Sequence, residues 1–224
     1  MKCLDLFNST ELFNILKKDE KELFLENSTF VTYKKGDCVV KEGEFVTNSI
    51  FICSGYVKIH LDFKSRSLII NLIGPKRFAS LSQMIGSDIQ PFSITSLDEI
   101  FVCLTDVKII RDIAQKNTML AMHLLQYANK GVLDYIKNNL ISLTQNNIHG
   151  RLANILIYLS ESVFQSTSFD MILSRKELSQ FCNISRENVI KVLYEFDTDG
   201  IIHINGKLIQ INSIENLRRI ANHG

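Results

Sequence analysis

Residues 174–196 read SRKELSQFCNISRENVIKVLYEF and carry the signals of two short helices joined by a tight turn. Ser174, with Glu177 three positions later, forms a capping box that starts the first helix. Asn183 stands where that helix must end, and asparagine readily adopts the left-handed conformation of a tight turn. Ser185 is placed to cap the second helix. The stretch therefore predicts a helix-turn-helix.

The second helix of this motif has an apolar face and a polar face. At about 100° per residue, Glu187, Lys191 and Tyr194 fall opposite the apolar positions. Such a helix fits the DNA major groove, where arginine or lysine donates to guanine and glutamate accepts from cytosine. The alternative is a helical hairpin whose Glu187 and Lys191 pair in solvent. The residues predicted to contact DNA from the two helices are Arg175, Lys176, Ser185, Arg186, Glu187, Asn188 and Lys191.

The segment after the second helix predicts a β-hairpin. Residues 201–204 and 207–211 are β-type apolar runs on either side of Asn205-Gly206, a dipeptide favoured in two-residue hairpin turns. A hairpin directly after a helix-turn-helix makes a winged helix. Lys207, at the tip of this wing, is placed to reach a DNA phosphate.

The first half of the chain has a different period. Between about residues 30 and 104, short apolar runs alternate with turns, and every second position within residues 57–63 is apolar. Many short strands separated by turns predict a sandwich or barrel-like β-domain.

Residues 117–143 lack proline and carry apolar residues three or four positions apart, which predicts a helix roughly 40 Å long. A small domain does not need a helix of that length. We interpret it as a dimer seam that also links two domains, and a core helix with one wet face is the alternative. The residues predicted to face a second copy are Leu124, Tyr127, Ala128, Val132 and Tyr135.

Composition restricts the function further. The chain has 224 residues and a net charge of +1, so any nucleic-acid binding must come from a local patch. Its five cysteines form no Cys-x-x-Cys pair, and no apolar run reaches the roughly 20 residues of a spanning helix. The first residues show no secretory signal, so we expect a cytoplasmic protein. We find no nucleophile elbow, phosphate loop or paired carboxylates, and therefore predict no enzyme activity.

Nearly the whole chain, from about Leu23 to Leu217, resembles the CRP/FNR family of bacterial transcription regulators. Arg186 and Glu187 match the family's base-reading residues, whereas Lys191 stands where a second arginine is common. The end of the helix, 196–202, is similar to a Bacteroidetes-like subgroup. The resemblance rests on six segments: YKKGD at 33–37, KEGE at 41–44, IFICSGYVK at 50–58, GRLA at 150–153, LSRKEL at 173–178 and ISRENV at 184–189.

The resemblance implies an α+β architecture: an N-terminal β-roll, jelly-roll-like and similar to cyclic-nucleotide-binding domains, then a long dimerisation helix and a C-terminal winged helix-turn-helix. We assign these to residues 1–115, 116–145 and 146–224. It also implies a homodimer on a palindromic site of double-stranded DNA, with half-sites about one helical turn apart. RNA polymerase and a small-molecule effector are further expected partners, and a membrane is not.

The sensor departs from the cyclic-nucleotide binders of the family, which carry a Gly-Glu pair and an Arg-Ser or Arg-Thr pair. Here Ala79 and Ser80 stand at the first pair, and Gln90 lies near the second. Without the arginine of the Arg-Ser or Arg-Thr pair, a bound anion loses most of its hydrogen-bond partners, so we predict that cAMP does not bind tightly. Lys76 and Arg77 offer positive charge, although a solvated turn is the simpler interpretation. The residues predicted to line the effector pocket are Arg77, Phe78, Ala79, Ser80, Leu81, Gln90 and Ile136.

The sequence also bears on two other kinds of sensor and on one competing function. An iron–sulfur cluster needs four clustered thiolates, and only Cys3 precedes the β-domain. The sequence therefore predicts that the protein holds no iron–sulfur cluster. A haem sensor stays open. The competing function is a cyclic-nucleotide-type module that regulates a protein partner, which would have no use for residues 174–196. The candidate haem ligands are His60, His123, His149 and Cys53.

Overall fold

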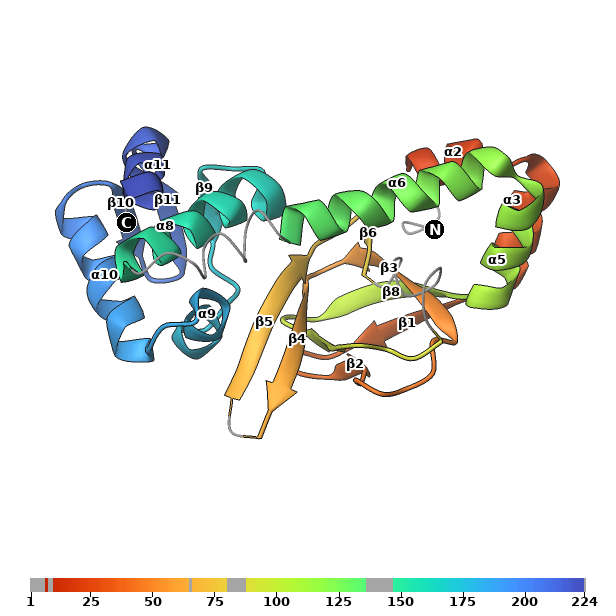
Figure 1. Cartoon of the computed structure of the whole chain (residues 1–224), viewed down its shortest axis with the longest axis horizontal. Helices are drawn as coiled ribbons and strands as arrows, with labels where there is room; N and C mark the ends of the chain where they lie inside the picture. Colours follow the sequence, from red (N-terminus) through yellow and green to blue (C-terminus); the bar gives the residue numbers. More distant parts are fainter. Residues whose placement is uncertain (1–6, 8–9, 65, 80–87, 136–146, 224) are drawn as a thin grey trace. The chain divides into compact units, whose positions relative to one another are not determined.

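Figure 1 shows the computed structural model of the chain, which describes residues 7, 10–64, 66–79, 88–135 and 147–223. The chain divides into two compact units. The first comprises Met1–Leu61 with Leu72–Leu133, and the second comprises Asp62–Asn71 with Asp134–Gly224. The predicted boundary between the long helix and the C-terminal domain, at 145–146, lies outside the described residues.

Two antiparallel four-stranded sheets form the β-domain that the run of short strands predicted, and they make the β-roll that the resemblance implied. The order of one sheet is β1 (Ser28–Tyr33), β8 (Ile100–Asp106), β3 (Asn48–Ser54), β6 (Arg77–Phe78). The order of the other is β2 (Cys38–Val40), β7 (Ser93–Ser96), β4 (Val57–Phe63), β5 (Arg66–Ile73).

The strand β3 is buried on both faces, which explains its unbroken apolar run IFIC. Successive side chains of a strand point to opposite faces. Ile50 and Ile52 therefore join one core cluster with Ile94 and Val102, between the strands of the roll. Phe51 and Cys53 join the other cluster, which lies beneath the helices.

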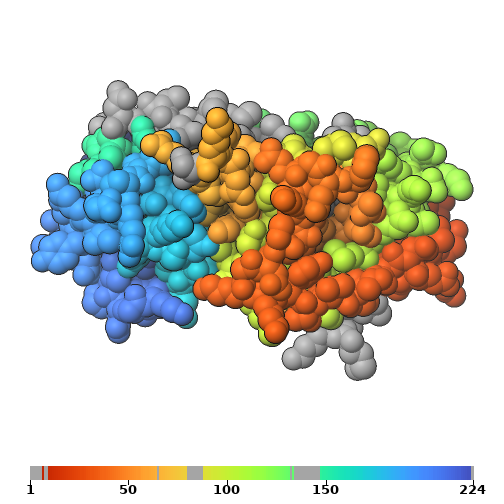
Figure 2. Space-filling view, turned by 90° about the horizontal axis from the view of Figure 1, so that it is seen from below, coloured from red at the N-terminus to blue at the C-terminus, as the bar shows by residue number. Residues whose placement is uncertain are grey.

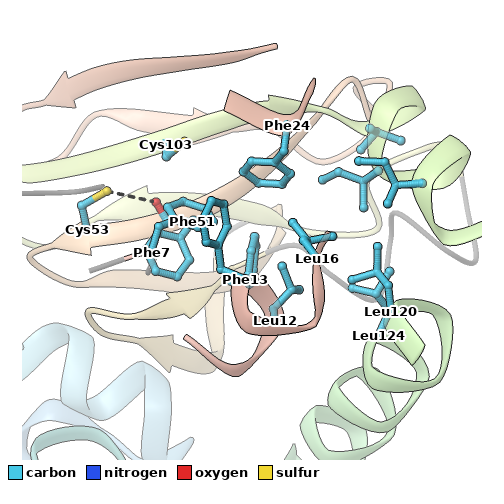
Figure 3. Packing of buried hydrophobic residues seen from close by; sticks show 14 of the residues in the cluster. Phe7, Leu12, Phe13, Leu16, Phe24, Phe51, Cys53, Cys103, Leu120 and Leu124 are labelled. Carbon is cyan, nitrogen blue, oxygen red and sulfur yellow. Dashed lines mark hydrogen bonds between the residues drawn. The ribbon is translucent and has the colours of Figure 1, made fainter. Parts of the chain in front are cut away.

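That second cluster is built from aromatic rings and aliphatic side chains (Figure 3). The ring centroid of Phe51 lies 4.1 Å from that of Phe7 and 5.0 Å from that of Phe78. Leu120 and Leu124 of the long helix complete it. The helices among the described residues of this unit are α2 (Glu11–Ile15), α3 (Lys18–Glu26), α5 (Val107–Lys116) and α6 (Thr118–Tyr135).

A glycine is required where β3 turns into β4. Gly55 has φ +79°, and a Cβ at this position would lie 2.6 Å from the carbonyl oxygen of Glu99. Asp98 holds the same turn, because its Oδ1 accepts a hydrogen bond of 2.7 Å from the backbone N–H of Tyr56. The segment SGY at 54–56 is therefore fixed by backbone geometry.

The long helix and the strand at 57–63 differ in part from what the sequence predicts. The long helix is described as Thr118–Tyr135, and the rest of the predicted range 117–143 lies outside the described residues, apart from Asn117, which caps α5. The alternation within 57–63 was wrong at its end, since Phe63 is exposed and His60 is buried. Phe63 lies beyond the part of β4 that pairs with β7, which extends only as far as His60.

From residue 147 onward, the second unit is a winged helix, as predicted, and its hairpin continues into a three-stranded sheet of order β10-β11-β9. The closing helix α11 was not anticipated, and it packs on α8. The elements are α8 (Ile148–Tyr158), the π-helical turn η2 (Leu159–Phe164), β9 (Ser168–Asp170), α9 (Arg175–Cys182), α10 (Arg186–Thr198), β10 (Ile202–Asn205), β11 (Leu208–Ile211) and α11 (Ile214–His223).

The turn of the wing lies one residue later than predicted. Asn205 still pairs with Leu208, so the two loop residues are Gly206 and Lys207. Gly206 has φ +61° and Lys207 is not among the residues with positive φ, as a type II′ hairpin turn requires. Lys207 is exposed at the tip, where the sequence placed it.

Among the described helices, none combines the length and the apolar character needed to cross a membrane.

The ring of Phe51 packs at the centre of the helix-covered core, and its exposed fraction is 0%. We expect Phe51→Ala to lower the free energy of unfolding by about 3–5 kcal/mol, because a buried cavity replaces the ring. The measurement is urea unfolding followed by circular dichroism. The control is Phe45→Ala, whose ring is 74% exposed and should change the value by less than about 0.5 kcal/mol. Equal effects of the two substitutions would contradict this packing.

Candidate nucleic-acid interface

Both helices of the motif begin at side-chain caps. The Ser174 Oγ accepts from the Glu177 N–H at 3.2 Å, and the Glu177 Oε2 accepts from the Ser174 N–H at 3.0 Å. This is the predicted capping box. At the second helix, the Ser185 Oγ accepts from the Asn188 N–H at 3.2 Å. Each cap satisfies backbone donors that the helix itself leaves unpaired.

The turn between the helices depends on Asn183, which adopts φ 51° and ψ 47°, the left-handed conformation expected of it. Arg151 of α8 holds the turn from outside, because its Nη1 donates to the Asn183 carbonyl at 3.1 Å. In the sequence, Arg151 stands out only as part of the GRLA segment at 150–153. No local pattern reveals a contact between positions 32 residues apart.

The inner face of α10 fixes the helix against the rest of the domain. Val189, Val192, Leu193 and Phe196 are all buried there. They occupy every third or fourth position, so the opposite side of the helix must face outward. Leu178, Phe181 and Cys182 of α9 are buried as well. Burial also raises the pKa of the Cys182 thiol, which keeps it protonated and inert.

The outer face of α10 presents a compact set of exposed side chains. Figure 2 shows the surface of this part of the chain in blue. Lys191 forms an ion pair with Glu195 one turn further along the helix, since its Nζ lies 3.8 Å from Glu195 Oε1. The other oxygen of Glu195, Oε2, lies 2.7 Å from His149 Nε2 on α8. This set mixes both charge signs with apolar groups. Its exposed members are Arg186, Glu187, Ile190, Lys191, Tyr194 and Thr198.

Glu187 is held in its charged form. Its own backbone N–H, the Ser185 hydroxyl and the neighbouring Arg186 all lower the pKa of the Glu187 carboxyl. A carboxylate at the first turn of a helix also benefits from the helix dipole. Glu187 therefore offers only hydrogen-bond acceptors, which suits the N4 amino group of cytosine in the major groove.

The remaining predicted DNA contacts occupy different settings. Arg175 is half-buried, and desolvation lowers its pKa, although an arginine stays charged. Lys176 and Lys207 are exposed and free to move toward phosphates. Ser185 and Asn188 already bond to each other in the cap, so their contacts to DNA stay predictions.

The residues predicted for an effector pocket are only partly described. Phe78 and Ala79 are buried and Arg77 is partly buried, whereas Ser80, Leu81 and Ile136 lie outside the described residues. Gln90 is 2% exposed, and its Oε1 finds no hydrogen-bond partner within the described part of the chain. Beside α6 the core leaves an apolar cavity of about 10 Å³, roughly the space of one water.

The predicted dimer residues also fall into two groups, those packed within their own chain and those that the structure describes only in part. Leu124 is 3% exposed and lies in the core of its own chain, and the Tyr127 hydroxyl accepts a hydrogen bond of 3.1 Å from the Phe78 N–H. These two therefore serve the fold of the single chain. Ala128 is partly buried, and the side chains of Val132 and Tyr135 are not described.

Two of the candidate haem ligands bond to neighbouring side chains. His60 Nε2 lies 2.8 Å from Thr95 Oγ1, and His149 Nε2 lies 2.7 Å from Glu195 Oε2. His123 lies partly buried on α6. Cys53 lies in the helix-covered core and is disulfide-bonded, so its prediction as a haem ligand was wrong, because a disulfide sulfur offers no thiolate to iron. Within the described residues, no three histidine, cysteine or acidic side chains gather as metal ligands would.

A capped helix-turn-helix with an exposed second helix and a hairpin wing defines a winged-helix DNA-binding domain. Residues 150–220 match the family model of the Crp-like helix-turn-helix domain. Over 196 residues, the chain is 26% identical to the CRP-like cAMP-activated global transcriptional regulator of Mycobacterium tuberculosis, covering 85% of this chain and 87% of that protein. Residues 150–220 therefore form a Crp-like helix-turn-helix domain, and most of the chain is similar to CRP/FNR transcription regulators.

A second regulator and one solved structure are also similar to this chain. The transcriptional activator protein anr of Pseudomonas aeruginosa is 23% identical over 188 residues, covering 81% of this chain and 76% of that protein. The structure of FixK2 from Bradyrhizobium japonicum shares the fold, with a TM-score of 0.80 at 16% identity, and covers 86% of this chain and 96% of that one.

The cap at Ser185 generates a prediction about Glu187. We expect Ser185→Ala to raise the pKa of the Glu187 carboxyl toward its ordinary value, because the hydroxyl that donates to the carboxylate is lost. The measurement is an NMR titration of the side-chain carboxyl. Ser174→Ala is the matched control, since it removes the equivalent cap of α9 and should leave the Glu187 titration unchanged. An unchanged titration in Ser185→Ala would refute the assigned hydrogen bond.

Proposed function

We propose that this protein is a homodimeric regulator that reads a palindromic DNA operator through the outer face of α10 and responds to an effector other than cAMP. The observation that carries the proposal is the exposed set beginning at Arg186 and Glu187 on a capped helix. This face offers donors suited to guanine and acceptors suited to cytosine. The implied partners are double-stranded DNA, a second copy of the chain, an effector and RNA polymerase.

The wing and α9 support a backbone-contacting role. Lys207 lies at the tip of the hairpin, and Arg175 and Lys176 lie at the N-terminal end of α9. Phosphate contacts of this kind set the register of a protein on the duplex without reading its sequence. We assign sequence reading to α10 and positioning to these three cations.

The exposed side of α6 supports the proposal of a homodimer. At about 100° per residue, its exposed apolar residues fall on a stripe roughly opposite Leu120, Leu124 and Tyr127, which face the core. A helix that is apolar on two faces needs a second partner for the outer one. The exposed apolar residues of α6 are Met119, Met122, Leu125 and Leu133.

The effector proposal rests on charge. The buried side chain near the position of the family's phosphate-binding arginine is Gln90, a neutral amide. An amide can hydrogen-bond to a ligand but cannot neutralise a cyclic phosphate, whose recognition usually takes a charged, bidentate partner. We therefore propose an effector without a cyclic phosphate, held in part by Gln90.

The reading face is tested by binding to an operator selected from a random duplex library. We expect Arg186→Ala and Glu187→Ala each to weaken binding by about 5- to 150-fold, the effect of one base contact. Lys207→Ala should instead weaken all sequences alike and reduce the salt dependence by about one phosphate. The control is Arg219→Ala, an exposed arginine of α11. Unchanged binding by both α10 variants would count decisively against the proposal.

The dimer is tested by placing a charge on the apolar stripe of α6. Leu125 is 50% exposed, and we expect Leu125→Asp to convert the dimer into a monomer, because a carboxylate in an apolar seam remains unpaired. Light scattering after size-exclusion chromatography measures the mass. Phe45→Asp, a charge on an exposed ring outside α6, should leave the dimer intact. A dimeric Leu125→Asp protein would rule out this seam.

The effector proposal predicts no tight binding of cAMP. Calorimetry with the purified protein should show no sub-micromolar site for this nucleotide. Gln90→Arg, which introduces a cation near the position of the family's arginine, is the matched variant and should bind cAMP more tightly than the wild type. Sub-micromolar binding by the wild type would overturn this part of the proposal.

A further inference from the structure

The outer face of α10 contains one residue that hydrogen bonding to bases or phosphates does not account for. Ile190 is 48% exposed, whereas its neighbours Val189 and Val192 are fully buried. A single exposed isoleucine is common on protein surfaces. This one differs in its setting, because it lies within the face assigned to base reading.

Helical spacing puts Ile190 in the middle of that face. It follows Arg186 by four positions and Glu187 by three, and Tyr194 follows it by four. Residues three and four apart are neighbours on a helix surface. The side chain of Ile190 is thus surrounded by the groups that would enter a major groove, and it must enter with them.

An apolar side chain can read only one feature of the major groove. Guanine, cytosine and adenine present hydrogen-bonding groups alone, whereas thymine also presents its C5 methyl group. Against the other bases, Ile190 would cover donors or acceptors without replacing their bonds to water, which costs free energy. Against thymine, it buries a methyl group.

We propose that Ile190 contacts a thymine methyl group and thereby makes a T·A pair part of each half-site. The three or four residues that separate it from Glu187 and Arg186 correspond to about 5–6 Å along the helix axis. The thymine should therefore lie about one or two base pairs from the pair that Arg186 and Glu187 read. This inference rests on the proposed function and adds a specificity-determining residue to it.

The test removes the methyl group and nothing else. A duplex selected by the wild-type protein is resynthesised with each thymine replaced in turn by deoxyuridine, and its affinity is measured by fluorescence anisotropy. We expect one thymine per half-site at which the wild type loses about fourfold in affinity, the effect of burying one methyl group. At that position, Ile190→Ala should bind the thymine and deoxyuridine duplexes within about twofold of each other.

Tyr194→Ala is the matched control, because it truncates another exposed side chain of the same face, one turn further on. It should keep the wild-type sensitivity to deoxyuridine at that thymine. The inference is overturned if no deoxyuridine weakens the wild type, or if Ile190→Ala remains as sensitive. Failure of the proposed function looks different, since the wild type would then select no duplex at all.

Discussion

The left-handed turn at Asn183 is the constraint on which the DNA-binding unit depends. It brings the end of α9 close to the start of α10, so the caps at Ser174 and Ser185 and the apolar faces of both helices operate together. Arg151 ties this turn to α8 through the Asn183 carbonyl. With one face buried and one end capped, α10 has a single outer face. The chemistry of recognition follows from which side chains occupy it.

The charge of that outer face is nearly balanced, which matters for a chain whose net charge is only +1. Glu187 stays ionised, and Glu195 lies close to both Lys191 and His149. A strongly basic helix would bind any duplex through its phosphates, with little regard to sequence. A balanced helix gains less from phosphates and depends more on base edges. An exposed isoleucine in such a helix is consistent with reading by shape and methyl contact.

The first unit solves a different packing problem. Its strand β3 serves two cores, one inside the β-roll and one beneath the helices, where Phe51 meets Phe7 and Phe78. The helix α6 closes the second core with Leu120 and Leu124 and still exposes Met122 and Leu125. One helix therefore provides both the cover of its own domain and an apolar outer surface.

Local patterns in the sequence determined a β-domain of short strands, the capped helix-turn-helix and the wing, because caps, turns and hydrophobic periods act over a few residues. The proposed reading face was predicted from the same periodicity, including Arg186 and Glu187. Tertiary structure decided what local patterns leave open. The sequence shows that α6 is apolar, but only packing assigns Leu124 to the core and leaves Leu125 outside. The support of Asn183 by Arg151 likewise arises where distant segments meet, and periodicity carries no record of such a contact.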